Sequence, residues 1–287
     1  MLIAIKFKAA MVAALVAAPA MMHSLAPAAV TTDAAFAEIA PADFSYRMAG
    51  DFSRAGRPAE APHSTARLAG KIRIMKRQVS AAEYRRCVDD GACPRIAPAD
   101  VGPDTPMVGV SWHDAEAYAA WMSRTTGLNY RLPTDQEWIF AAAESARDEV
   151  APLIDPSDPA QAWIARYEAE SARASSVVLA PQPIGTFGRN SNGLLDVGGN
   201  VWEWTESCFV RARLDGEAVY VTNTNCGVRV VEGAHRTYMT DFIRDPRSGG
   251  CAAGVPPANL GFRLVAEDRS PVVSGIVENL LGLLHRT

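Results

Sequence analysis

A short stretch rich in glycine, amides and carboxylates constrains the fold of this chain more than any other. Residues 190–204 read Asn-Ser-Asn-Gly-Leu-Leu-Asp-Val-Gly-Gly-Asn-Val-Trp-Glu-Trp. The glycines permit backbone conformations that other residues avoid, so the stretch predicts tight turns in place of repeating structure. Asp196 and Glu203 bring carboxylates into these turns. Such oxygens either bind a hard cation such as calcium or accept hydrogen bonds from the loop itself.

The composition is that of an ordinary globular protein. The 287 residues are 48% hydrophobic with a formal net charge of −4, which is enough apolar material for one large core or two smaller ones. The chain contains no sustained run of lysine or arginine. We therefore expect neither a nucleic acid nor an anionic membrane surface as its main partner.

The N-terminal residues have the pattern of a secretory signal. Lys6 and Lys8 give a positive start, and an apolar stretch over residues 9–18 follows them. Pro19 ends this stretch too early for a membrane anchor, which needs roughly 20 apolar residues. Of several Ala-x-Ala sites, we expect cleavage at residues 35–37. Residues 1–37 are then the signal peptide, and the mature protein is periplasmic with no stable membrane span.

Export changes how the five cysteines are interpreted. In an oxidising compartment Cys87 and Cys93 can close a small loop, and Cys208 and Cys226 can join the two ends of a longer insertion. This pairing leaves Cys251 over. A leftover cysteine is either chemically used, paired with another molecule, or a small buried side chain.

Regular structure is predicted most clearly in the first half of the mature chain. Residues 71–79 have strand character, and N-cap signals at Ser80, Ser111 and Thr134 each predict the start of a helix. Apolar residues at helical spacing predict the buried faces of the last two helices: Ala115, Tyr118, Ala119 and Met122, then Trp138, Ala141 and Ala142. From about residue 152 onward Pro, Gly, Asn and Ser interrupt the apolar runs, so we expect short elements and long loops.

Four segments follow one another in an order that carries family information. They are Pro106–Ala115, Thr126–Gly127 with Tyr130–Trp138, Asn192–Leu194 with Gly199–Trp204, and Asn259–Arg263. In this order they resemble the hallmark segments of the formylglycine-generating enzyme, or sulfatase-modifying factor, family. The resemblance implies that residues 38–266 form an α+β, irregular, loop-rich single domain of the C-type-lectin-like type with low secondary-structure content. Beyond it, residues 267–287 carry an apolar stripe that predicts a helical tail, either docked on the core or binding a partner.

The resemblance also implies a structural calcium site, and it shows where a copper site would have to lie. The family's calcium loop falls on Asp196, Gly199, Val201 and Glu203 of this chain. Formylglycine-generating enzymes hold Cu(I) with two cysteines, five positions apart, because soft thiolates suit cuprous ion. Cys251 matches the second of them, but Pro246 stands where the first is required. Formylglycine generation is therefore not expected, and any copper binding would rest on a single thiolate.

A groove is expected where the family has its active site. His235, Arg236 and Tyr238 lie in the segment that leads to this groove in the family. We expect Trp202 and Arg263 to shape it, with Cys251 at its edge. The alternative for this polar segment is a salt-bridge network at the surface.

Two functions follow from these expectations. The segments around His235 and Cys251 resemble exported members of the family that are encoded beside copper nitrite reductases. The protein is then a maturation or modifying factor for a periplasmic redox or metalloprotein, with a copper nitrite reductase as the candidate partner. The alternative is an oxidoreductase acting on a protein, peptide or small exported substrate, with Cys251 and His235 as its catalytic residues.

Overall fold

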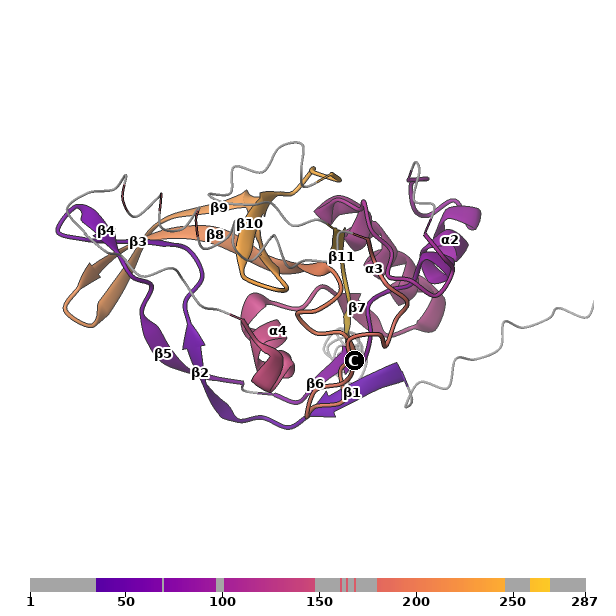
Figure 1. Cartoon of the computed structure of the whole chain (residues 1–287), viewed down its shortest axis with the longest axis horizontal. Helices are drawn as coiled ribbons and strands as arrows, with labels where there is room; N and C mark the ends of the chain where they lie inside the picture. The colour runs from indigo at the N-terminus through magenta and orange to yellow at the C-terminus, as the bar shows by residue number, and fades with distance from the viewer. Residues whose placement is uncertain are drawn as a thin grey trace, which may run out of the picture.

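The computed structural model describes residues 35–68, 70–96, 101–147, 161, 164, 168, 180–245 and 259–268. Within them the chain is a mixed α and β structure with long connections (Figure 1). A four-stranded antiparallel sheet has the order β1-β6-β12-β7. Its strands are Phe36–Ile39, Ile72–Met75, Val265–Glu267 and Asn129–Arg131. The beginning and the end of the domain thus meet in one sheet.

A larger sheet has the order β10-β9-β8-β3-β4, and β11 pairs in parallel with the start of β8. Its strands are Thr237–Thr240, Ala218–Glu232, Trp202–Asp215, Asp51–Arg54, Arg57–Ala59 and Leu260–Gly261. A separate two-stranded antiparallel sheet joins β2, Asp43–Arg47, to β5, His63–Arg67. In Figure 1, β8 and β9 form a long ribbon that extends away from helices α2 and α3.

Three α-helices begin at the predicted N-caps. Helix α2 spans Ala81–Asp89, α3 spans Trp112–Thr126 and α4 spans Asp135–Ala142, with a 3-10 turn, Ala143–Ser145, after the last. Ser80, Ser111 and Thr134 each form a complete capping box with the acidic residue three positions later. The helix predictions are therefore confirmed, including the end of α3 at Gly127, which adopts a left-handed φ of 83°.

An arginine holds the acidic residue of each capping box through two hydrogen bonds. The pairs are Arg77–Glu83, Arg244–Asp114 and Arg131–Glu137, with nitrogen–oxygen distances of 2.6–2.8 Å. Burial by itself would raise the pKa of these three carboxyl groups. The arginine and the capping backbone reverse that effect and lower each pKa below its usual value. Each helix start is thereby fixed to the chain segment that supplies the arginine.

The main apolar core lies around α2, α3 and the hallmark segments. Ala115, Tyr118 and Ala119 are buried as predicted, while Met122 packs at the margin. The Tyr118 ring stacks on Tyr84 at 5.9 Å between centroids and contacts Phe262 edge-on at 5.5 Å. The predicted stripe of α4 is also buried, and Trp138, Ala141 and Ala142 are all at most 1% exposed.

Both predicted disulfides are present. Cys87, in the last turn of α2, joins Cys93 just after that helix, and Cys208 joins Cys226 across β8 and β9. Gly91, inside the first loop, has a φ of 68°, which explains why a glycine turns the chain there.

The expectation of short elements after residue 152 is wrong for the ribbon. Strands β8 and β9 have 14 and 15 residues and are the longest strands in the described part of the chain. Thr, Val, Tyr and Asn fill the outer half of β9, where residues 220–227 are all exposed. The apolar alternation that signals a half-buried strand is therefore absent from β9, whereas β8 has buried Ala212 and Leu214 between exposed residues.

Two strands lie across the domain boundaries expected from the sequence. β1 begins at Phe36, and Phe36 and Ala37 are buried and paired with Met75 and Ile74, so a boundary after residue 37 falls inside this strand. The expected boundary after residue 266 falls inside β12 in the same way. The remaining tail, residues 269–287, lies outside the described residues. Among the described helices, none is long and apolar enough to cross a membrane.

The acidic residues of the capping boxes predict that the domain loses stability at low pH, and substitution of Glu137 measures the contribution of one of them. Glu137→Gln keeps an acceptor for the cap but removes the charge that faces Arg131, and we expect a loss of about 1.5–3 kcal/mol near pH 7. Because the pKa of Glu137 is lowered by folding, its contribution is present above about pH 4 and is lost as the pH falls through the folded-state pKa. Urea unfolding should therefore show the difference between variant and wild type shrinking near pH 3. The exposed Glu38→Gln is the control, and an equal difference for Glu137→Gln at both pH values would contradict the assignment.

Candidate functional site

The centre of the hallmark segments is a buried ion pair. Glu203, at the start of β8, and Arg263, just after β11, both have side chains with 0% exposure. Arg263 Nε lies 2.6 Å from Glu203 Oε2, and Nη2 lies 2.7 Å from Oε1. The two residues meet because β11 pairs in parallel with β8, with Gly261 opposite Glu203. The Trp-Glu-Trp and Leu-Gly-Phe-Arg segments are therefore joined through their charged residues.

The remaining hydrogen-bonding capacity of the pair is used by surrounding segments. Glu203 also accepts hydrogen bonds from Gln78 Nε2 at 2.7 Å and from the Trp138 indole at 2.8 Å. Arg263 donates to three backbone carbonyls, those of Met75, Lys76 and Leu195. A fully satisfied charge pair of this kind connects the four-stranded sheet, helix α4 and the glycine-rich loop.

Asp196 shapes the glycine-rich loop from within. Its carboxylate is buried and accepts hydrogen bonds from the backbone N–H groups of Gly185, at 2.5 Å, and Phe187, at 2.7 Å. Its own backbone has a φ of 57°, the left-handed region that aspartate tolerates better than most residues. The Asp196 carboxylate thus joins residues 185–187 to the glycine-rich loop.

The two carboxylates expected to bind calcium accept hydrogen bonds from the protein itself in this geometry. Calcium takes about six to eight oxygen ligands. Asp196 already serves two backbone donors, and four N–H donors point at Glu203. A calcium ion on Glu203 would also lie beside the Arg263 guanidinium, which repels it. The calcium site expected at Asp196, Gly199, Val201 and Glu203 stays a prediction.

Trp202 and His235 lie together, but inside the domain. Trp202 is 4% and His235 6% exposed. The Trp202 indole donates to the His235 carbonyl at 3.2 Å, and the two rings meet edge-on at 5.4 Å. Gly233 permits this contact, since a Cβ at that position would lie 2.7 Å from the Trp202 ring. The expected groove residue Trp202 is thus a packing residue, and so is Arg263.

Arg236 and Tyr238 also belong to an internal network. Arg236 Nε donates to Glu232 at 2.6 Å, and its guanidinium lies over the Tyr46 ring at 5.3 Å. Tyr46 donates in turn to Asp135. The Tyr238 hydroxyl accepts the Gly50 N–H at 2.7 Å, and burial raises the pKa of Tyr238 to about 12. This segment therefore forms a salt-bridge network and not a groove. The expected network lay at the surface, whereas the side chains of the Arg236–Glu232 pair are buried.

Cys251 and Pro246 lie outside the described residues, but the chain on either side of them is fixed. Arg244 binds Asp114 at the start of α3, and the Asn259 carbonyl accepts the Trp202 N–H at 3.0 Å. His113 contacts Asp241 at 3.2 Å nearby. The described residues before this segment therefore contact the N-terminus of α3, and those after it contact the start of β8.

Sequence reasoning missed the polar partners in this centre. Gln78 and Asp135 lie next to helix caps and are buried, and Trp138 was identified only as part of an apolar stripe. The signal that could have found Trp138 is its indole N–H, because a buried indole almost always has an acceptor. Glu203 is that acceptor.

Removal of the cation from this centre should strongly destabilise the domain. Arg263→Met leaves Glu203 buried with only Gln78 and Trp138 as donors, and we expect a loss of about 3–5 kcal/mol in urea unfolding near pH 7. The control is Arg67→Met, because the side chains of the Arg67–Asp43 pair are 73% and 54% exposed and such pairs contribute about 0–1 kcal/mol. Adding Glu203→Gln to Arg263→Met removes the uncompensated charge and should restore part of the loss. Similar losses for the two single variants would contradict the role of the pair.

Comparison with known proteins identifies one family of similar chains. The model of the sulfatase-modifying factor enzyme 1-like domain matches residues 25–268. The inactive C-alpha-formylglycine-generating enzyme 2 of Mus musculus is 32% identical over 173 residues, covering 58% of this chain and 51% of the relative. The formylglycine-generating enzyme of Streptomyces coelicolor is 32% identical over 171 residues, covering 56% and 52%. The chain thus spans about half the length of the curated relatives it matches.

A solved structure supports the fold. PvdO from Pseudomonas aeruginosa superposes with a TM-score of 0.52 and 24% identity, over 81% of this chain and 94% of that one. At this identity the likeness shows the fold alone, a loop-rich single domain of mixed helix and strand. The family match covers most of the sequence and agrees with the resemblance of the four ordered segments. The chain belongs to the sulfatase-modifying factor enzyme 1-like domain family.

Proposed function

We propose that this protein is an exported member of its family that binds and matures a periplasmic redox or metalloprotein and does not generate formylglycine. The observation that carries the proposal is Pro246, five positions before Cys251. A two-thiolate Cu(I) site needs a second cysteine there, and proline offers no ligating side-chain atom. A single thiolate at Cys251 can still bind copper transiently during delivery to a partner.

The placement of the expected groove residues supports the same proposal. Trp202, Arg236, Tyr238 and Arg263 hold the interior together, so these residues serve the scaffold. Relatives of equal identity include one named an enzyme and one named inactive, so identity does not decide between catalysis and binding. Function must then be argued from the segment around Cys251.

Export is supported by two features. The N-terminus has the positive start and apolar stretch of a signal, and two disulfides are formed, as in proteins of oxidising compartments. Cleavage after Ala37 would remove two buried residues of β1, whereas the Ala26-Pro27-Ala28 site leaves that strand whole. We therefore expect the mature chain to begin at Ala29 or close to it. Mass spectrometry of the protein secreted to the periplasm checks this, and a start at Glu38 would contradict it.

The maturation proposal predicts an effect on a partner enzyme. A copper nitrite reductase is the candidate partner, taken from the resemblance to exported family members. Co-production with this protein in the periplasm should raise the copper content per reductase molecule under limiting copper, measured by metal analysis of the purified reductase. Cys251→Ser should abolish the gain, while Cys251→Ser and wild type should reach equal periplasmic levels. An unchanged copper content would count against the proposal.

Oxygen consumption distinguishes the alternative function. The purified protein, supplied with Cu(I), oxygen and a cysteine peptide, should consume no more oxygen than its Cys251→Ala variant and should leave the peptide cysteine unconverted. The Streptomyces coelicolor formylglycine-generating enzyme serves as the positive control for the assay. Oxygen uptake that depends on Cys251 would instead establish an oxidoreductase, and variants of His235 would then test its second catalytic residue.

A further inference from the structure

The two disulfides of the domain lie in opposite environments. Cys87 and Cys93 are 0% and 7% exposed, so their sulfur atoms are shielded from solvent thiols. Cys226 is exposed and Cys208 is half-buried. The Cys208–Cys226 bond also lies where the ladder between β8 and β9 is irregular, since Cys208 is opposite Arg229 and the next residue, Phe209, is opposite Asn225. One disulfide is therefore reachable and the other is not.

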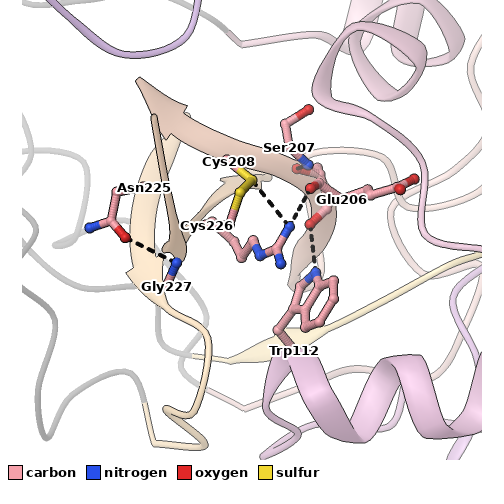
Figure 2. Close-up of a disulfide and its surroundings, with 9 residues drawn as sticks. Trp112, Glu206, Ser207, Cys208, Asn225, Cys226 and Gly227 are labelled. Atoms are coloured by element: carbon pink, nitrogen blue, oxygen red, sulfur yellow. Dashed lines mark hydrogen bonds between the residues drawn. A yellow bond between two sulfur atoms is a disulfide. The ribbon is translucent and has the colours of Figure 1, made fainter. Parts of the chain in front are cut away.

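The guanidinium group of Arg229 lies beside Cys208 Sγ, the less exposed sulfur atom of the Cys208–Cys226 disulfide (Figure 2). Arg229 Nη1 is 3.4 Å from Cys208 Sγ and donates to the Glu206 carbonyl at 2.7 Å. The Arg229 guanidinium carbon also lies 3.8 Å from the centre of the Trp112 ring. The Trp112 indole is held in turn by the Thr205 carbonyl at 3.0 Å. Stacking and hydrogen bonding thus fix a cation beside one sulfur atom of the pair.

Arg229 places a positive charge beside Cys208. Burial lowers the pKa of Arg229, and three carboxylates, those of Asp241, Glu116 and Glu206, raise it by less. Arginine keeps its proton near neutral pH because its usual pKa lies far above neutral. A thiolate that forms at Cys208 Sγ therefore lies 3.4 Å from a guanidinium nitrogen.

We propose that Cys208–Cys226 is a site of thiol–disulfide exchange, at which the thiolate of a peptide cysteine or of a small thiol attacks the Sγ atom of Cys226. A bond forms between the incoming sulfur and Cys226, the Cys208–Cys226 bond breaks, and its electron pair goes to Cys208 as a thiolate. Attack by the Cys208 thiolate on the mixed disulfide reverses the step. Attack by a second thiol releases an external disulfide and leaves both cysteines reduced.

The geometry selects which sulfur is attacked and which one leaves. Exchange requires access to the attacked sulfur, and Cys226 is the exposed one. It proceeds faster when the leaving thiolate is stabilised, and a neighbouring arginine lowers the cost of a thiolate. Arg229 stands beside Cys208, so both requirements favour the same direction of attack.

The fold can keep its shape when the bond opens. Outside the disulfide, β8 and β9 are paired from Phe209 opposite Asn225 to Asp215 opposite Ala218. Inside it, Trp204 is opposite Val231, and β10 pairs with β9. The two thiols therefore stay close after exchange, and closure of the bond is an intramolecular reaction.

The relative opening rates of the two disulfides test this proposal. Native oxidised protein is treated with reduced glutathione, quenched by alkylation at intervals, and analysed by peptide mass spectrometry. We expect Cys208–Cys226 to open at least about tenfold faster than Cys87–Cys93, with the transient glutathione adduct on Cys226. Equal rates, opening only in unfolding concentrations of urea, or an adduct confined to Cys208 would overturn the proposal. A second arm replaces glutathione with an extended cysteine peptide, and the faster arm identifies the preferred source of the thiol.

Variants of Arg229 separate a chemical role from mere exposure. Arg229→Gln should slow the opening of Cys208–Cys226 by about three- to tenfold, whereas Arg229→Lys, which keeps the charge, should retain most of the rate. The matched control is Arg213→Gln, because Arg213 also lies over an aromatic ring of the ribbon, Tyr220, at a position remote from the disulfide along both strands. Near-ultraviolet circular dichroism checks that each variant is folded. A folded Arg229→Gln that opens as fast as wild type would remove Arg229 from the mechanism.

Discussion

The ion pair between Glu203 and Arg263 is the interaction on which the rest of the domain depends. Two charges without solvent contact are costly to bury, and here the cost is offset because both carboxylate oxygens and all three guanidinium nitrogens have hydrogen-bond partners. Their neighbours come from β6, α4 and the glycine-rich loop, so a chain with long connections is fixed at one point. Regular backbone alone would not hold these segments in register.

A second principle of the same kind organises the helices. Each of the three described α-helices starts with a capping box whose acid is held by an arginine, and the arginine comes from outside that helix. Arg77 and Arg131 lie shortly before their caps, whereas Arg244 lies 130 residues beyond Asp114. The last pair therefore links the start of α3 to the chain that leads toward Cys251. The Asp114 carboxylate therefore caps α3 and also holds Arg244 in place.

The sequence predicts features that depend on residues a few positions apart, and it does not reveal contacts between residues far apart in the chain. Caps at Ser80, Ser111 and Thr134 depend on residues a few positions apart, and all three are confirmed. The burial of Trp202 depends on Gly233, and the state of Glu203 on Arg263, so neither can be deduced from its own neighbourhood. The ribbon escaped prediction because residues 220–227 of β9 are exposed on both faces, so this strand lacks the alternation that β8 shows at Ala212 and Leu214. Motif resemblance supplied the fold but placed Trp202 and Arg263 in a groove.

The hallmark segments of this family therefore describe the interior of the domain and not its reaction. Trp138, Glu203 and Arg263 satisfy one another's charges and hydrogen bonds, and a partner would reach none of them without unfolding the core. All four segments are present here although, by the resemblance on which the proposed function rests, Pro246 stands where the family's first cysteine is required. What distinguishes this chain from its relatives must lie where side chains meet solvent. The outer half of the ribbon, with its exposed disulfide, is such a place.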